Sequence, residues 1–506
     1  MAKGQAFDTA ALLRACNPWW QGGARLRPRA LANPAAAQPA DDVASGGTPA
    51  TGQTIASATL AKRVLGWLGA ADAPQVLLLE GQRLTGKTTL LDAVANGLLA
   101  GGLPVGSLCR ALLDGSPLRW QTVEHLLDAW QALYPGQVKA RWLLVDDLHL
   151  WPAERLAELA GQLARTGVRL VAASLPGVAW PVTGAAVVRL NTASFADFLQ
   201  LRGVTHGLPP APRSLRETFE WPRSQFVAMT DDLRTLGAHF HDYLMLGGYL
   251  PALHAPSVAD AHTRLREALV RSALSVDGPA RHNIRRIDDL LRTLDYLAAR
   301  SGSLLDVPDL CGQLSVERPT VRHFLQLLED LALVRRVPPL GYGDSVQRAR
   351  FLICMQDPAL TRALLHQEQF ELLSDAAVDA AVESAIHRHL QGTYGSRGAL
   401  VSYAPSGRQG ATLVVGSGRT LLPFARHYGT AKTTARDLGG LIAFCQQHAI
   451  PRAYVATRVA EDCGPLLLAG NEAMAVMRLP AALLCLWLAA ADVPRLELRP
   501  ASLPAR

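Results

Sequence analysis

Residues 81–88 have the types and the spacing of a loop that binds phosphate groups. The segment reads Gly81-Gln82-Arg83-Leu84-Thr85-Gly86-Lys87-Thr88 and fits the pattern G-x-x-x-x-G-K-[ST] at every fixed position. In such a loop, glycines let backbone N–H groups face the β-phosphate, the lysine contacts the β- and γ-phosphates, and the hydroxyl binds Mg²⁺. We therefore predict that Lys87 contacts the phosphates, that Thr88 binds Mg²⁺ and that Thr89 lies near the α-phosphate.

Two acidic residues that end an apolar segment could complete this site. Asp146 and Asp147 follow Trp142-Leu143-Leu144-Val145, about sixty residues after the loop. A nucleotide site of this kind needs an acid at the tip of a neighbouring strand, so we predict that Asp146 binds the metal and that Asp147 orients the attacking water. Aspartate is one methylene shorter than the glutamate that many such ATPases use, which predicts slow hydrolysis. Ser174 ends the next expected strand and is predicted to sense the γ-phosphate, although serine there is also ordinary turn chemistry.

The elements that must position these residues follow from the pattern around them. Strands and helices alternate from about residue 55 to 190, which predicts a parallel α/β sheet, with an extra strand between the loop and the acidic segment. Helical periodicity then dominates to about residue 300, and 304–337 has the outline of a winged helix-turn-helix. We predict five parts: an N-terminal helix and flexible segment (1–54), a core (55–215), a helical lid (216–300), a winged helix (301–371) and a C-terminal domain (372–506).

Composition limits the class of protein. The 506 residues are 49% hydrophobic and 18% charged, which is enough apolar material for sizeable cores. We find no apolar run long enough to span a bilayer and no secretory signal at the N-terminus, so we expect a cytoplasmic protein without membrane contact. The seven cysteines are scattered and form no zinc-binding spacing. A net charge of +7 over this length is compatible with nucleic acid as a partner but does not decide it.

Several segments together resemble a known family. They are Asn-Pro-Trp-Trp at 17–20, EGQRLTGKTTL at 80–90, LLVDDLHLWP at 143–152, LNTASFADFLQLRG at 190–203, FHDYLMLGGYLPAL at 240–253 and MQDP at 355–358. The chain resembles prokaryotic P-loop ATPases of the AAA type that carry a winged helix and a C-terminal domain related to restriction-type nucleases. The resemblance implies ATP as the nucleotide, Mg²⁺ as the metal, and a P-loop NTPase parallel sheet followed by a lid, a winged helix and a nuclease-like α/β domain.

The C-terminal domain departs from that family. Members with a nuclease-like core combine a helical glutamate, which corresponds to Glu383, with an acid and a Glu-x-Lys on two strands. Here the strand 411–415 has no carboxylate, and 422–427 has neither the acid nor the lysine. One glutamate cannot hold a metal, so we expect a nuclease-like fold without cutting activity. We expect His387 and His389 to be surface or packing residues, and Asp437 could supply the missing acid only in a rearranged site.

Three features stay open at this stage. The adjacent Trp19 and Trp20 could anchor a peptide or dock on the chain's own first domain, and we favour docking. The second helix of the winged-helix segment could contact DNA or pack internally. An arginine of the run after residue 270 could reach a γ-phosphate, or the run could be a solvated face. The residues concerned are Arg318, Arg322 and His323 on the helix and Arg271, Arg281, Arg285 and Arg286 in the run.

We therefore expect a Mg²⁺-dependent ATP-binding protein that hydrolyses ATP and couples nucleotide state to double-stranded DNA or to a protein partner. The alternative is a nucleotide-gated switch or scaffold with little turnover, which binds DNA or protein through its winged helix and C-terminal domain. Self-association into a homo-oligomer is compatible with either hypothesis. An active nuclease with an ATPase regulator is disfavoured by the missing carboxylates.

Overall fold

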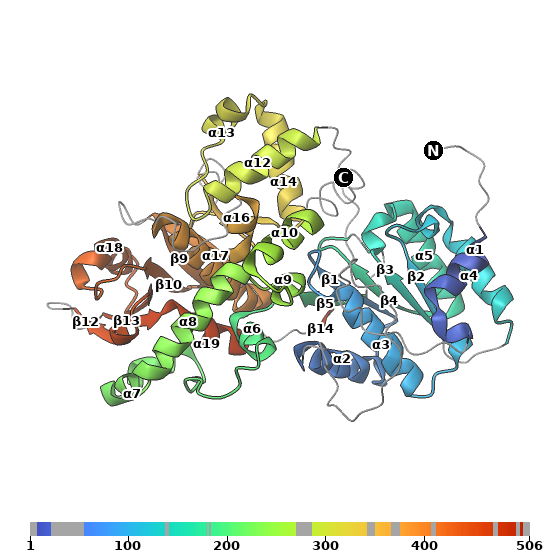
Figure 1. The fold of residues 1–506 in the computed structure, drawn as a ribbon, viewed down its shortest axis with the longest axis horizontal. Coiled ribbons are helices and arrows are strands. Elements are labelled where there is room, and N and C mark those ends of the chain that lie inside the picture. The colour runs from blue at the N-terminus through green and yellow to red at the C-terminus, as the bar shows by residue number, and fades with distance from the viewer. Residues whose placement is uncertain are drawn as a thin grey trace. The chain divides into compact units, whose positions relative to one another are not determined.

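The computed structural model describes residues 8–21, 55–136, 141–178, 180–181, 184–269, 286–341, 350–365, 375–405, 411–468, 474–491 and 496–498 (Figure 1). The chain forms two compact units, one of Met1–Leu190 with Pro494–Arg506 and one of Asn191–Val493. The boundaries predicted at residues 215, 300 and 371 all fall inside the second unit and stay predictions.

The first unit is built on a six-stranded sheet in the order β14-β5-β1-β4-β3-β2. Five strands are parallel: β1 (Val76–Gly81), β2 (Leu108–Leu112), β3 (Trp142–Asp146), β4 (Arg169–Ser174) and β5 (Ala186–Leu190). Their residues are almost all buried, as expected of a parallel sheet that is covered on both faces. The sixth strand, β14 (Leu496–Leu498), pairs antiparallel with β5, and nothing in the sequence pattern predicted this return of the chain.

The sheet order brings the predicted site residues to one edge. β4 lies between β1 and β3, and in its pairing with β1 Ser174 is opposite Glu80. The carboxyl ends of parallel strands meet at the same edge, so the loop after β1, the acidic end of β3 and Ser174 are neighbours there. The extra strand predicted near Val105 is β2, which begins three residues later.

Helices cover the sheet. In the first unit they are α1 (Thr9–Cys16), α2 (Ile55–Leu68), α3 (Lys87–Ala100), α4 (Val123–Leu133) and α5 (Ala153–Thr166), with 3₁₀ turns at Pro18–Gln21, Val105–Ser107, Pro117–Trp120 and Leu148–Leu150. Apolar residues of α2 and α3 form one buried core with strand residues such as Leu77, Leu144 and Val171. Packing against this core fixes α3, and with it the loop from which α3 starts.

The N-terminal segment docks on the edge strand β2. Asn17 is fully buried and both donates to and accepts from the backbone of Arg110. The Trp20 indole donates to the carbonyl of Leu108 at 3.0 Å, and the Trp19 indole approaches the same oxygen at 3.4 Å. These side chains satisfy backbone groups that an edge strand leaves unpaired. Docking on the chain's own first domain is thus confirmed, whereas the flexible segment predicted at 22–54 lies outside the described residues.

The second unit combines helices with a mixed sheet in the order β12-β13-β11-β10-β9-β8. Its helices are α6 (Phe195–Leu201), α7 (Arg223–Ala228), α8 (Thr230–Leu246), α9 (Leu250–Leu253), α10 (Val258–Ala268), α12 (Ile287–Ala299), α13 (Val307–Leu314), α14 (Arg318–Asp330), α16 (Pro358–Leu364), α17 (Asp375–Thr393), α18 (Gly439–Gln447) and α19 (Ala481–Ala491). Its strands are β6 (Val334–Val337), β7 (Leu352–Met355), β8 (Leu400–Pro405), β9 (Ala411–Ser417), β10 (Thr420–His427), β11 (Arg452–Thr457), β12 (Gly464–Leu467) and β13 (Ala475–Pro480). The described residues of this unit also include four 3₁₀ turns, at Leu215–Glu220, Gly395–Arg397, Ala435–Leu438 and Ala460–Asp462.

Two features of this unit bear on the predictions. α13 and α14 pack together and β6 follows them, which is the order of helix, longer helix and strand that 304–337 predicted. β6 pairs antiparallel with β7, which lies beyond that range and was not predicted. Its identity as a winged helix stays a prediction. In the parts of the chain that the structure describes, no helix combines the length and the apolar character needed to cross a bilayer.

Candidate functional site

The loop after β1 has a tightly constrained backbone. A Cβ on Gly81 would lie 2.3 Å from the carbonyl oxygen of Leu190, so this position admits only glycine without movement of β5. Gly86 has a φ of 88°, which glycine adopts without strain, and Leu84 also has a positive φ of 67°. The loop backbone is therefore left-handed at two points, Leu84 and Gly86.

Lys87 and the start of α3 supply the positive groups of the site. The Lys87 ammonium is buried and donates to the carbonyl oxygens of Gly81 and Gln82 at 2.8 and 2.6 Å. α3 begins at Lys87 directly after Gly86, which has no side chain that could cap the first amides of the helix. Those amides and the positive end of the helix dipole can therefore bind an anion. Thr88 and Thr89 are half-buried in the same first turn.

Asp147 is held in an unusual environment. Its φ is 60°, and its carboxylate lies 3.3 Å from the guanidinium of Arg83, which also pairs with Asp114 at 3.2 Å. Burial raises the pKa of Asp147 to about 7, Arg83 opposes this rise, and the neighbouring Asp146 adds to it. A carboxyl group with this pKa changes charge near neutral pH, which suits a general base. The sequence singled out Asp147, but it did not indicate that Arg83 of the loop pairs with it.

Asp146 and Ser174 are buried at the ends of their strands. Asp146 is 4% exposed, and a buried arginine, Arg110, approaches its Oδ2 to 3.9 Å. Ser174 is fully buried, and its hydroxyl has no hydrogen-bond partner within the described residues. A buried hydroxyl in this state costs free energy unless a ligand or water satisfies it. Sequence analysis missed Arg110, although an arginine inside a short buried strand was a signal that could have been used.

The residues at this edge fit Mg²⁺ bound together with a nucleotide. A threonine hydroxyl and one carboxylate are hard oxygen ligands, and Mg²⁺ typically takes few protein ligands and completes its shell with phosphates and water. Within the described residues, no cluster of three or more His, Cys, Asp or Glu side chains could bind a metal independently of a nucleotide. Thr88 and Asp146 would thus hold the ion only as part of a nucleotide complex.

Glu383 of the second unit forms a buried ion pair with Arg426. Arg426 of β10 donates to Glu383 at 2.8 Å and also pairs with Asp379, one turn earlier on α17. Burial raises the pKa of Glu383, and Arg426 opposes this rise. A guanidinium in direct contact with the carboxylate provides the positive charge that a metal would otherwise supply. The expected lack of cutting activity stays a prediction.

His387 and His389 are packing residues. Both are buried, and burial lowers the pKa of each imidazole to about 3, so the rings are neutral. Nε2 of His389 accepts a hydrogen bond from the backbone amide of Phe195 at 2.9 Å, and Nδ1 lies 2.7 Å from the carbonyl oxygen of Ala385. The packing alternative of the prediction is therefore confirmed, and the surface alternative is wrong.

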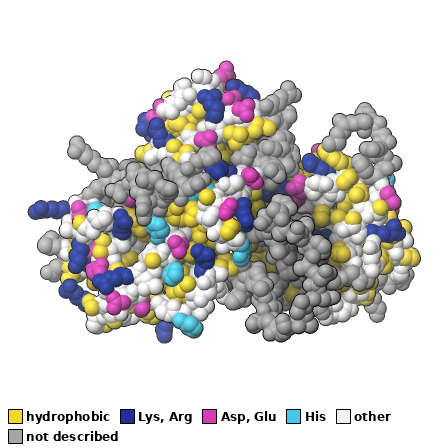
Figure 2. All heavy atoms as spheres, in the orientation of Figure 1, with side chains coloured by type: hydrophobic (Ala, Val, Ile, Leu, Met, Phe, Trp, Pro, Cys, Tyr) yellow, Lys and Arg dark blue, Asp and Glu magenta, His cyan; other side chains and the backbone are white. Residues whose placement is uncertain are grey.

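Helix α14 exposes basic groups. Arg318, Arg322 and His323 are exposed, whereas Val321 and Phe324 are buried, as the helical pattern predicted. Of the arginine run after residue 270, Arg286 pairs with Asp289 at 2.5 Å, and the other members lie outside the described residues. On the face shown in Figure 2, basic and acidic side chains are interspersed and do not gather by sign. The exposed basic groups of α14 are compatible with the DNA contact that the sequence left open, which stays a prediction.

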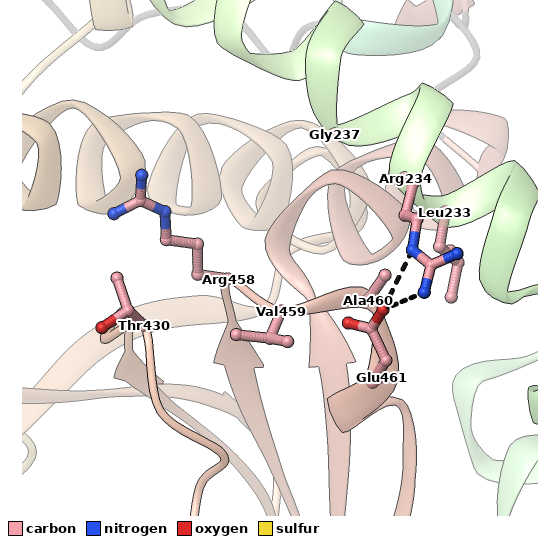
Figure 3. Close-up of a pocket in the computed structure, with 8 residues that line it drawn as sticks. All are labelled: Leu233, Arg234, Gly237, Thr430, Arg458, Val459, Ala460 and Glu461. Carbon is pink, nitrogen blue, oxygen red and sulfur yellow. Dashed lines mark hydrogen bonds and ion pairs between the residues drawn. The ribbon is translucent and has the colours of Figure 1, made fainter. Parts of the chain in front are cut away.

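A hollow of about 330 Å³ lies in the second unit between α8 and the segment after β11 (Figure 3). Arg234 donates to Glu461 at 2.9 Å on one side of it, and Arg458 and Thr430 lie on the other. Both arginines are exposed, and one of them is already paired with a carboxylate. The hollow has no buried polar group that would select a ligand among the residues that line it.

A family model and solved structures both match parts of the chain. A model for a domain of unknown function, DUF8612, matches residues 237–371. No curated protein matches the chain at a significant level. Among solved structures, the Aeropyrum pernix Orc1 protein in complex with DNA is 11% identical, with 64% of this chain and 92% of that chain covered and a TM-score of 0.29. AMPPCP-bound DnaA from Aquifex aeolicus is 16% identical, with 54% and 86% covered and a TM-score of 0.24. Scores this low carry no argument about function, so the description of the fold rests on the chain's own parallel five-stranded sheet.

Proposed function

We propose that this chain is a Mg²⁺-dependent ATP-binding protein that hydrolyses ATP and couples its nucleotide state to a partner, either double-stranded DNA or another protein. One observation carries the proposal. The loop 81–88 joins a buried parallel strand to a helix, with a buried Lys87 held by its carbonyls and an acid-ended strand at the same edge of the sheet. That combination of left-handed loop, lysine and helix N-terminus suits a triphosphate.

Each residue then has a role that follows from its place. Lys87 and the loop amides bind and orient the phosphates. Thr88 and Asp146 would hold the metal ion, which when bound neutralises charge on the phosphates. Asp147 accepts hydrogen bonds from the attacking water and orients it. The buried hydroxyl of Ser174 responds to the γ-phosphate, and this role is supported by its lack of a partner within the described residues.

The choice of ATP and of the partner rests on other observations than the loop geometry. ATP follows from the family resemblance of the segments 80–90 and 143–152. A nucleic-acid partner is supported by the exposed Arg318, Arg322 and His323 on one side of α14. A protein partner or a second copy of the chain would be compatible with the same site chemistry.

The test is phosphate release with Mg²⁺-ATP, with and without double-stranded DNA. We expect turnover in the intact protein and none in Lys87→Ala, because the buried ammonium is the group that contacts the phosphates. Lys62→Ala is the matched control, since Lys62 is an exposed lysine of the same unit. Equal turnover in Lys87→Ala and Lys62→Ala would refute the proposal. Acceleration by DNA that is reduced in Arg318→Ala/Arg322→Ala would identify DNA as the partner.

One observation favours the second candidate function, a nucleotide-gated switch with little turnover. Asp147 is paired with Arg83 and has a pKa near neutrality, so part of the population lacks an ionised base at pH 7. A switch should retain nucleotide through purification and release little phosphate. Nucleotide extracted from the purified intact protein but not from Lys87→Ala, together with phosphate release at background level, would establish the switch in place of the hydrolase.

A further inference from the structure

A buried arginine links the N-terminal segment to the acid that we assign to the metal. Arg110 is the middle residue of β2, and its backbone is fixed by Asn17. The Asn17 side chain accepts from the Arg110 amide at 2.7 Å and donates to the Arg110 carbonyl at 2.9 Å. It also donates to the carbonyl of Leu13 at 2.7 Å. With its backbone held on both sides, Arg110 cannot shift along the strand, and only its side chain is free to change partners.

The guanidinium of Arg110 lies between two carboxylates. Its Nη2 is 2.7 Å from Oδ1 of Asp92 and 3.9 Å from Oδ2 of Asp146. All three side chains are buried, with exposed fractions of 5% or 6%. The contact with Asp92 is a direct ion pair, whereas 3.9 Å is beyond hydrogen-bond distance. Arg110 therefore neutralises charge near Asp146 without occupying the oxygens of that carboxylate.

Asp92 belongs to the helix that carries the other predicted metal residue. It lies four residues after Thr88 on α3, so the two side chains are on the same face of the helix, about one turn apart. Arg110 thus connects α3 and β3, the two elements from which Thr88 and Asp146 come. Charged groups in a buried site interact strongly, and a guanidinium that moved by about 1 Å would bond directly to Asp146.

We propose that Asp92 is a positioning residue that holds Arg110 away from Asp146 and so keeps the Asp146 carboxylate available to the metal ion. This inference rests on the proposed function of the site. When Asp92 loses its charge, Arg110 turns to Asp146, the second carboxylate that it approaches, and competes with Mg²⁺ for it. When Arg110 is replaced together with Asp92, the competitor is gone, and the Mg²⁺ concentration at half-saturation returns to that of the intact protein.

The experiment is a Mg²⁺ titration of the binding of a fluorescent ATP analogue, mant-ATP, to the full chain. For Asp92→Asn we expect the Mg²⁺ concentration at half-saturation to rise about tenfold, which corresponds to ~1.4 kcal/mol and to the low end of a charged hydrogen bond. For Asp92→Asn/Arg110→Met we expect a value within about twofold of the intact protein, since a buried ion pair can be replaced by uncharged groups at little cost. The affinity for mant-ATP in EDTA should not change in any variant.

The outcomes distinguish a failure of the proposed function from a failure of the inference about Asp92. If the intact protein does not bind mant-ATP at all, the proposed function fails. If it binds but Asp92→Asn needs no more Mg²⁺, or if the double variant needs as much as Asp92→Asn, the inference is overturned while the proposed function stands. Arg110→Met gives an independent reading should Asp92→Asn not fold. The inference requires that this variant need no more Mg²⁺ than the intact protein, whereas an arginine that oriented Asp146 for the metal would make the requirement rise.

Discussion

The pKa of Asp147 leads to a prediction about the pH dependence of hydrolysis. A general base acts in its ionised form, and burial raises the pKa of this carboxyl from its ordinary value of about 3.9 to about 7. The ionised fraction in the free protein is then about 9% at pH 6 and about 91% at pH 8, so kcat/KM for Mg²⁺-ATP, which reports the free protein, should rise about tenfold between these values. An aspartate with an ordinary pKa would be ionised throughout this range and would give a flat profile.

Replacement of Arg83 separates this effect from ionisation of the nucleotide itself. Arg83 lies 3.3 Å from Asp147 and lowers its pKa, so Arg83→Ala should move the midpoint of the profile to higher pH. The ionisation of the free nucleotide does not depend on this substitution. The assay is phosphate release at constant ionic strength from about pH 5.5 to about pH 9. A flat profile in the intact protein, or an unchanged midpoint in Arg83→Ala, would refute the assignment of Asp147 as the base.

The raised pKa of Asp147 also affects stability. The kcat/KM for hydrolysis should rise with pH, whereas the contribution of this group to the free energy of unfolding should fall. Because the folded-state pKa of Asp147 is above the unfolded value, the folded chain binds more protons than the unfolded chain between about pH 4 and about pH 7. This group therefore reduces the free energy of unfolding as pH rises through that window. Asp147→Asn should remove this contribution, and a difference between the two proteins in urea midpoint that does not grow with pH would contradict it.

Three further substitutions test the packing that supports the site. Asn17→Ala should lower the free energy of unfolding by ~2 kcal/mol in urea titrations, because it leaves buried backbone groups of edge strand β2 without hydrogen bonds. A loss below ~0.5 kcal/mol would show that the N-terminal segment docks without the hydrogen bonds of Asn17. Gly81→Ala should abolish mant-ATP binding and lower the melting temperature, because the added Cβ would lie 2.3 Å from the Leu190 carbonyl oxygen. Unchanged mant-ATP binding in this variant would show that the clash does not occur. Glu383→Gln should destabilise the protein by ~2 kcal/mol by weakening the pair with Arg426, and unchanged stability would indicate that the pair is not formed.

Local patterns in the sequence predicted much of the first unit. The loop, its flanking strand and helix, and the acidic strand follow from contiguous residues, so they could be read without knowledge of the fold. The pairing of 496–498 with β5 could not, because it joins segments about 300 residues apart through backbone hydrogen bonds that leave no pattern in side chains. The partners of Arg83 and Arg110 were equally hidden, since each pair forms only when separate strands or helices meet.

The acids chosen from the sequence share one feature that only the structure reveals. An arginine lies within 4 Å of each: Arg83 is 3.3 Å from Asp147, and Arg110 is 3.9 Å from Asp146. In both cases that arginine has another carboxylate partner at a shorter distance, 3.2 Å in the first pair and 2.7 Å in the second. Each arginine therefore offsets the charge of an acid at the loop while it also pairs with a second carboxylate.

Glu383 lies closer to its arginine than Asp146 and Asp147 lie to theirs. Here the guanidinium donates directly to the carboxylate at 2.8 Å, a hydrogen-bond distance, so at least one of its oxygens is already used. A metal would have to displace this bond and leave Arg426 buried beside a second positive charge, which is costly in a site of low polarity. Among these three acids, the distance to the arginine thus separates the two at the loop from Glu383. The longer distances at the loop leave carboxylate oxygens that a ligand could use, whereas Glu383 of α17 is part of a buried ion pair.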